Sequence, residues 1–190
     1  MRRPLLRLFA VWKSRITDCN HYETYEERTI AMEHKIITPE VDTELAVIIR
    51  KNLENAHLDI PGTAYFDPEL DHLSSYYLEQ PETRRYIVLF DEDGQLLGGI
   101  GLAEFENIEN CAEMQKLYLR DEAKGKGLGK LLVTLIEAAA RELGYKKLYL
   151  ETHTNLDIAI KLYERMGFTL IERPDFVQHT TMDRFFIKDL

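Results

Sequence analysis

The chain has 190 residues, a length that suits one domain with a substantial hydrophobic core. Hydrophobic residues make up 45% of it and charged residues 30%, which is typical of a soluble globular protein. Its 33 acidic side chains outnumber the 24 basic ones, and the net charge of -9 argues against nucleic acid or an anionic membrane as partner. The charge is compatible with a cationic substrate, although many acidic proteins are merely soluble.

The cysteines and histidines give no sign of a metal site or a disulfide framework. Cys19 and Cys111 are far apart and lack C-x-x-C spacing, and the six histidines are scattered. We therefore expect no metal, a reducing compartment and a cytoplasmic location. No apolar run is long enough to span a bilayer, so no membrane association is expected.

The first residues differ in character from the rest of the chain. Up to Thr17 they are basic and contain no acid, which resembles a targeting leader, but the apolar run is short and Arg7 interrupts it. We expect residues 1–31 to be a poorly ordered N-terminal extension, or the product of translation from an upstream start, rather than a leader. The folded domain is expected to comprise residues 32–190.

Helices and strands are predicted to alternate from Met32 onward. A capping threonine and a proline open a helix at Thr38-Pro39-Glu40, and Asp67-Pro68-Glu69 opens a second one. The turn signal Asp93-Gly94 separates two apolar runs, which predicts a hairpin. The expected strands cover residues 35–37, 86–90, 96–105, 112–119, 147–151, 168–171 and 185–187, and the later helices cover residues 128–143 and 156–166. This order indicates a mixed α/β sheet with flanking helices.

A glycine-rich loop, Lys124-Gly125-Lys126-Gly127-Leu128-Gly129, precedes the helix of residues 128–143. Alternate glycines let backbone N–H groups converge on a ligand, and the helix dipole favours an anion there. The Walker pattern fails because Leu131 follows Gly129-Lys130, and the dinucleotide fingerprint fails at its third glycine, where Lys130 stands. A phosphate or pyrophosphate of another ligand is therefore expected.

The loop resembles the [RQ]-x-x-G-x-[GA] signature of the GNAT acetyltransferase superfamily. Residues 155–168 resemble the second motif of that family, N-x-x-x-A-x-x-L-Y-x-x-x-G-F, and the match in order and spacing covers about residues 35–170. Lys124 stands where the family has Arg or Gln, and Asp121 where it often has Pro. Lysine keeps a positive charge but loses the bidentate fork, so we expect an adjusted cofactor affinity.

The resemblance implies a GNAT-like fold: a mostly antiparallel sheet of six or seven strands, splayed after the central strand and flanked by about four helices. It also implies acetyl-CoA as co-substrate. The pantetheine arm would pair with the backbone of Leu117 and Leu119 and with the Asn155 side chain. The pyrophosphate would be held by the amides of Lys124, Gly125, Lys126, Gly127, Leu128, Gly129 and Lys130.

The reaction implied is attack of an amine on the acetyl thioester, and the resemblance implies two catalytic residues. Tyr163 would protonate the departing thiolate, although it also fits a core-facing helix stripe. Glu113 would be the base, with Glu151 or water as the alternative; strand alternation predicts that residues 113, 115, 117 and 119 share one face. The amide of Leu119 is the expected oxyanion donor.

Other candidates carry ordinary structural alternatives. His153 is a relay or a loop histidine bonded to backbone. An aromatic group, Tyr65, Phe66, Tyr76 and Tyr77, either surrounds an amine or packs helices. The prediction is an N-acetyltransferase acting on a primary amine of a small molecule or peptide. A non-catalytic acyl-CoA sensor or a partner-binding module is the alternative, acyl-chain preference stays open, and a homodimer is left open because dimers are common in that family.

Overall fold

A computed structural model describes residues 32–177 and 181–190, so the predictions for residues 1–31 lie outside the described residues. A seven-stranded sheet has the order β1-β2-β3-β4-β5-β7-β6. The strands are β1 (Glu33–Ile36), β2 (Arg85–Phe90), β3 (Leu96–Glu104), β4 (Cys111–Leu119), β5 (Lys147–Thr152), β6 (Thr169–Ile171) and β7 (Arg184–Asp189). The helices are α2 (Asp42–Asn55), α3 (Leu73–Glu79), α4 (Leu128–Glu142) and α5 (Asp157–Arg165).

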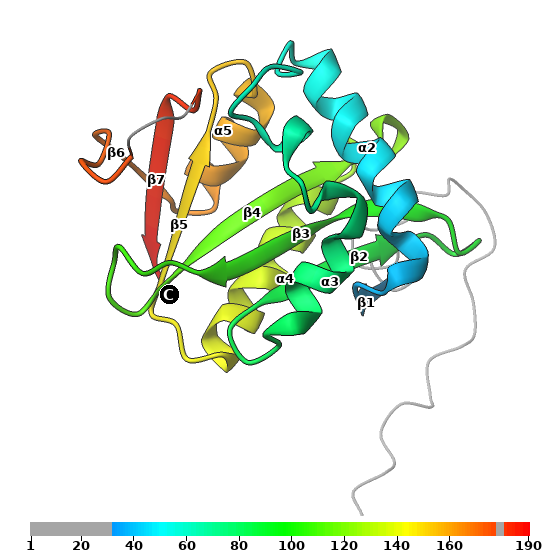
Figure 1. Ribbon diagram of the computed structural model, residues 1–190, viewed down its shortest axis with the longest axis horizontal. Helices are drawn as coiled ribbons and strands as arrows, with labels where there is room; N and C mark the ends of the chain where they lie inside the picture. The colour runs from blue at the N-terminus through cyan, green and yellow to red at the C-terminus, as the bar shows by residue number, and fades with distance from the viewer. Residues whose placement is uncertain (1–31, 178–180) are drawn as a thin grey trace, which may run out of the picture. The chain divides into compact units, whose positions relative to one another are not determined.

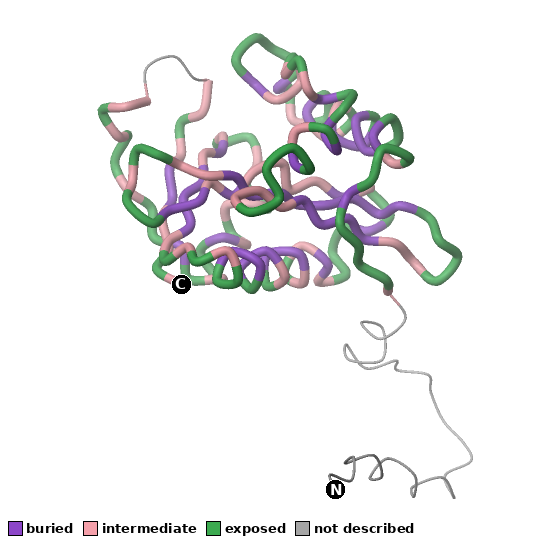
Figure 2. Tube along the Cα trace, turned by 60° about the horizontal axis from the view of Figure 1, so that its bottom comes forward, coloured by how far each residue is buried: buried purple, intermediate pink, exposed green. Residues whose placement is uncertain are grey.

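The sheet is antiparallel throughout except where β4 pairs with β5 in parallel. Helices α2 and α3 cover one face of the sheet, and α4 and α5 lie on the other (Figure 1). Figure 2 shows the buried residues along the sheet and on the sheet-facing sides of the helices. The predicted fold class is confirmed.

Apolar periodicity explains the two long helices. Helix α2 buries Leu45, Ile48, Ile49 and Leu53 after a 3-10 turn that begins at Pro39, and α4 buries a stripe from Leu128 to Ala140. Gly144, with φ of +90°, follows the end of α4 in the left-handed conformation that glycine allows at a helix C-terminus. Within the described residues, no helix combines the length and the hydropathy needed to cross a membrane.

The second helix starts later than predicted. A 3-10 turn covers Leu70–His72, and α3 begins only at Leu73, since His72 has the non-helical angles φ -141° and ψ 39°. The buried carboxylate of Asp42 accepts hydrogen bonds from the Ser74 amide at 2.8 Å and its hydroxyl at 2.5 Å. A residue 32 positions upstream therefore satisfies the first turn of α3, which a local cap signal does not predict.

Candidate active site

Strands β4 and β5 separate in the middle of the sheet. They pair from Cys111↔Lys147 to Glu113↔Tyr149, and their remaining residues have no mutual pairing. Figure 1 shows the two strands starting side by side and diverging. This is the predicted splay after the central strand, and it leaves backbone groups of two strands facing a gap.

A β-bulge at Lys116 changes which side chains share a face of β4. Lys116 has φ of +50°, and the register with β3 shifts between Gly99 and Gly101. Because the extra residue reverses the alternation, the prediction of one common face for residues 113, 115, 117 and 119 is wrong. Gln115 is hydrogen-bonded to both Tyr77 and Glu113 on the α2/α3 side of the sheet. Leu117 and Leu119 instead pack in the core on the α4 side.

The main chain of Leu119 is directed into the gap. The Arg120 amide donates to Leu97 O at 2.8 Å, which makes Leu97 and Arg120 a hydrogen-bonded pair. Leu119, opposite Gly98, then turns its N–H and C=O away from β3. Its carbonyl accepts a bond from Asn52 Nδ2 at 2.9 Å, a contact that the sequence analysis missed.

The glycine loop has the geometry of an anion-binding turn. Gly125 and Gly127 have φ of +73° and +80°, conformations that favour glycine, and α4 begins directly after Gly127. A Cβ on Gly129 would lie 3.0 Å from Leu162 Cδ2, so this glycine lets α4 approach α5 closely. The first-turn N–H groups of α4 point out of the helix end at this loop, where an anion would accept from them.

The two departures from the family pattern contact each other. Lys124 Nζ lies 2.6 Å from Asp121 Oδ1, and this bond is the main cause that lowers the pKa of Asp121 below its usual value. Both side chains are largely exposed, so the pair is accessible to solvent and to salt. Asp121 therefore neutralises the positive charge of Lys124, the first residue of the loop.

Asn155 and His153 lie at the N-terminal side of α5. Asn155 Nδ2 donates to Ala56 O at 2.8 Å, just after α2, which leaves the amide oxygen as the atom that could accept from a ligand. His153 Nδ1 accepts the backbone N–H of Asn155 at 3.1 Å. This bond matches the loop-histidine alternative for His153 and gives it a structural role.

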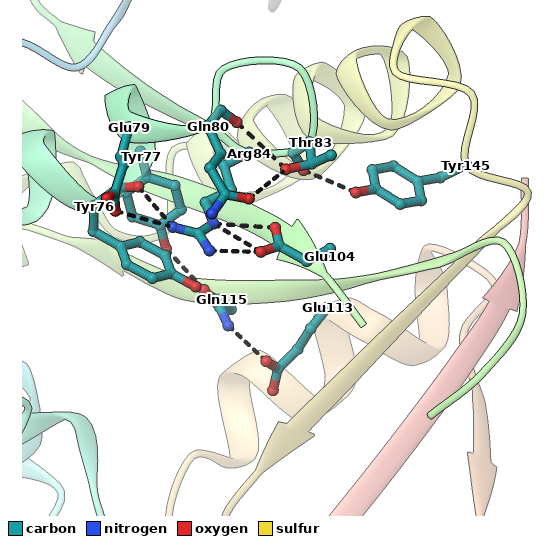
Figure 3. Close-up of polar contacts among 10 residues, drawn as sticks. All are labelled: Tyr76, Tyr77, Glu79, Gln80, Thr83, Arg84, Glu104, Glu113, Gln115 and Tyr145. Carbon is teal, nitrogen blue, oxygen red and sulfur yellow. Dashed lines mark hydrogen bonds and ion pairs between the residues drawn. The ribbon is translucent and has the colours of Figure 1, made fainter. Parts of the chain in front are cut away.

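Glu113 sits at the end of a polar relay, drawn in Figure 3. Gln115 Nε2 donates to Glu113 Oε2 at 2.6 Å, and the hydroxyl of Tyr77 donates to Gln115 Oε1 at 3.0 Å. Burial is the main cause that raises the pKa of Glu113, the Gln115 bond opposes it, and the neighbouring Glu151 raises it further. A carboxylate of raised pKa in a polar relay suits a general base.

Glu151 occupies the corresponding place on β5. The hydroxyl of Tyr149 donates to Glu151 Oε1 at 3.0 Å, and burial raises the pKa of Glu151 as well. Glu113 pairs with Tyr149 across the two strands, so both carboxylates lie on the same sheet face where the strands begin to separate. Together they form an acidic site that would attract a cation.

Tyr163 lies on α5, in the core below the other sheet face. It is 7% exposed, and its ring centroid lies 6.0 Å from those of Phe168 and Phe186. Burial raises its pKa, so the phenol stays protonated at neutral pH. Burial is also the main cause that raises the pKa of Tyr118 on β4, with a smaller contribution from Tyr163, so the two phenols lie near each other.

Two of the four aromatic candidates, Tyr76 and Tyr77, already contact other side chains. The ring of Tyr76 already carries the Arg84 guanidinium at 4.1 Å, and Arg84 is bonded to Glu104 (Figure 3). Tyr77 is buried against Tyr86, as the packing alternative expected. Among the described residues no three His, Cys, Asp or Glu side chains cluster as metal ligands.

The family model described as the acetyltransferase (GNAT) family matches residues 51–168 of this chain. The chain belongs to that family. This GNAT chain is 39% identical over 112 residues to the uncharacterized N-acetyltransferase YjgM of Escherichia coli, an alignment that covers 58% of this chain and 65% of YjgM. The chain thus spans slightly less than two thirds of that relative.

Solved structures support the GNAT fold assignment. A GNAT-family acetyltransferase from Staphylococcus aureus superposes with a TM-score of 0.73 at 20% identity, covering 84% of this chain and 99% of that one. The PaiA N-acetyltransferase from Thermoplasma acidophilum, solved with coenzyme A, gives a TM-score of 0.64 at 21% identity, with 84% and 99% covered. At these identities the likeness shows the fold.

Proposed function

We propose that this GNAT chain transfers the acetyl group of acetyl-CoA to a primary amine of a cationic small molecule or peptide. The observation that carries the proposal is the separation of β4 and β5 beyond Glu113 and Tyr149. Glu113 and the Leu119 main chain border this opening on β4, the glycine loop follows β4 in the chain, and family membership supports an acyl-CoA there.

The residues present suit acetyl-CoA. The Leu119 N–H points into the gap, where an extended pantetheine arm would add as a strand. Two left-handed glycines and the start of α4 would hold the pyrophosphate, and the Asn155 amide oxygen would accept from the arm. When bound, acetyl-CoA supplies the activated thioester, and the Leu119 N–H would stabilise the developing oxyanion.

The acceptor would approach from the α2/α3 side. Glu113 and Glu151 would attract its ammonium group, and Glu113, held by Gln115, would take the proton that makes the amine nucleophilic. A raised carboxyl pKa brings the base closer to neutral pH, where transfer is more efficient. Tyr163, from the α5 side, would donate a proton to the departing sulfur.

The test has a binding step and a turnover step. Thermal unfolding of the full chain should shift upward with acetyl-CoA and not with NAD, by several degrees at about 100 times Kd. Thiol release is then measured with primary amines that carry, or lack, a second positive charge. No shift at saturating acetyl-CoA would refute the cofactor assignment, and a shift without turnover on any amine would favour the acyl-CoA sensor.

A further inference from the structure

A second hollow lies away from the gap, between the sheet edge and α4. Its volume is about 320 Å³, at the small end of the range for small-molecule sites. The lining comes from β1, β2 and the C-terminal half of α4: His34, Lys35, Ile36, Arg85, Ile87, Leu135, Ala138, Ala139 and Glu142. Ala138 comes ten positions after Leu128, so the hollow lies about 15 Å along α4 from the glycine loop.

One donor atom of Arg85, which lines this hollow, is buried without a partner. Arg85 Nε is inaccessible to solvent and has no hydrogen-bond partner among the described residues. Buried polar atoms of native proteins nearly always have one, so a lone guanidinium donor indicates a partner that is absent here. Glu142 also lines the hollow, but its carboxylate is not on this nitrogen.

The rest of the lining is mainly apolar. Ala138 and Ala139 are small, so the helix leaves space over β1 and β2, while Ile87 forms the floor. Ile36 is 40% exposed there, an apolar surface that a ligand would cover. Lys35 is paired with Glu33 at 2.7 Å, whereas the buried Nε of Arg85 has no partner among the described residues.

We propose that this hollow binds a short aliphatic carboxylate, with the carboxylate on the Arg85 guanidinium and the alkyl chain over Ile36, Ile87 and Ala138. Arginine pairs with a carboxylate through two parallel hydrogen bonds. The apolar floor favours a ligand with a hydrocarbon portion over a bare anion such as phosphate. The site is independent of acetyl-CoA binding, since no lining residue belongs to the gap.

The experiment follows the Arg85 Nε–H and backbone amide signals of the full chain by ¹H–¹⁵N NMR. The probes are butanoate, hexanoate, the neutral analogue butanamide and inorganic phosphate. Saturable shifts at Arg85, Ile36 and Ala138 with both carboxylates, tighter for hexanoate and at least tenfold weaker for butanamide, support the proposal. Absence of saturable shifts there, or tighter binding of phosphate than of hexanoate, overturns it.

Three variants locate the site. Arg85→Gln should weaken hexanoate binding at least tenfold, and Glu142→Gln should strengthen it because a negative charge in the lining is removed. Ala138→Leu should remove the preference for hexanoate over butanoate by filling the hollow, which keeps the test valid if the Arg85 variant folds poorly. Arg141→Gln makes the same charge change as Arg85→Gln, at a position of α4 outside the lining, and should leave binding unchanged. Equal hexanoate affinity in the Arg85 and Arg141 variants would contradict the proposal.

Discussion

Asn52 ties helix α2 to the end of the central strand: its amide nitrogen donates to Leu119 O at 2.9 Å and to Ile48 O at 2.8 Å. The Leu119 carbonyl belongs to the backbone that faces the gap between β4 and β5. One side chain of α2 therefore helps to hold the peptide that joins Leu119 to Arg120, together with the bond from the Arg120 N–H to Leu97 O. Since the proposed oxyanion donor is the N–H of the same residue, Asn52 acts as a positioning residue.

Replacing Asn52 by Ala should lower kcat about tenfold, because the Leu119 segment loses one of the two bonds that hold it. KM for acetyl-CoA should change less than kcat, since the glycine loop is untouched. Steady-state kinetics on the variant check this, beside Val47→Ala, a truncation at an exposed position of the same helix. A lower melting temperature with unchanged kcat would make Asn52 merely structural.

Glu113→Gln should abolish most turnover while stabilising the fold at neutral pH. Turnover should fall about 100-fold or more, because the proposed base is lost. Glutamine can still accept from Gln115 and carries no charge. Burial holds the pKa of Glu113 above its usual 4.5, so the wild-type group favours folding below that pH and costs stability as pH rises through the folded pKa.

The melting temperatures of wild type and Glu113→Gln, measured from pH 4 to pH 8, check the sign. The curves should meet near pH 4 and the variant should be higher at pH 8, by about 2 °C or more. Glu151→Gln is the matched variant on the neighbouring strand. If it loses more turnover than Glu113→Gln, the base is Glu151 instead.

Apolar periodicity and the positions of the glycines predict most of the architecture, because both signals come from residues that are close together in the chain. The stripe of α4, the Asp93-Gly94 hairpin and the glycine loop each depend on residues close together in the chain, where sequence spacing maps directly onto geometry. Motif spacing also selects Tyr163 and Asn155 as site residues, and their roles stay predictions. These local rules are therefore sufficient to propose a site.

The errors arise where distant residues or unusual backbone angles decide the outcome. Lys116 adopts φ of +50° although nothing in its residue type requires it, and this single bulge reverses the faces of β4 beyond Gln115. The late start of α3 depends on Asp42, and the Leu119 orientation on Asn52; both contacts span more than 30 residues. Sequence spacing carries no signal for such long-range bonds.

Tyr163→Phe should separate chemistry from packing. Phenylalanine retains the ring that packs with Phe168 and Phe186, so the melting temperature should be nearly unchanged. Loss of the hydroxyl should reduce kcat about 10- to 100-fold, with little change in the affinity for acetyl-CoA. Tyr145→Phe, which removes a hydroxyl bonded to Thr83 O, is the control; equal kcat in both variants would exclude Tyr163 as the proton donor.

Asp121→Asn should strengthen acetyl-CoA binding. Asp121 holds Lys124 Nζ at 2.6 Å and places a negative charge beside the proposed pyrophosphate site. Removing that charge frees the lysine, and because both groups are exposed we expect only about a threefold decrease in Kd. Lys124→Ala should weaken binding, and both effects should shrink at high salt since they are electrostatic. Titration calorimetry at low and high ionic strength checks this, with Glu109→Gln, in the turn that precedes β4, as the charge-matched control. If Asp121→Asn binds acetyl-CoA more weakly than wild type, the carboxylate instead orders the loop, and its departure from the family pattern would be a requirement of this chain's cofactor site.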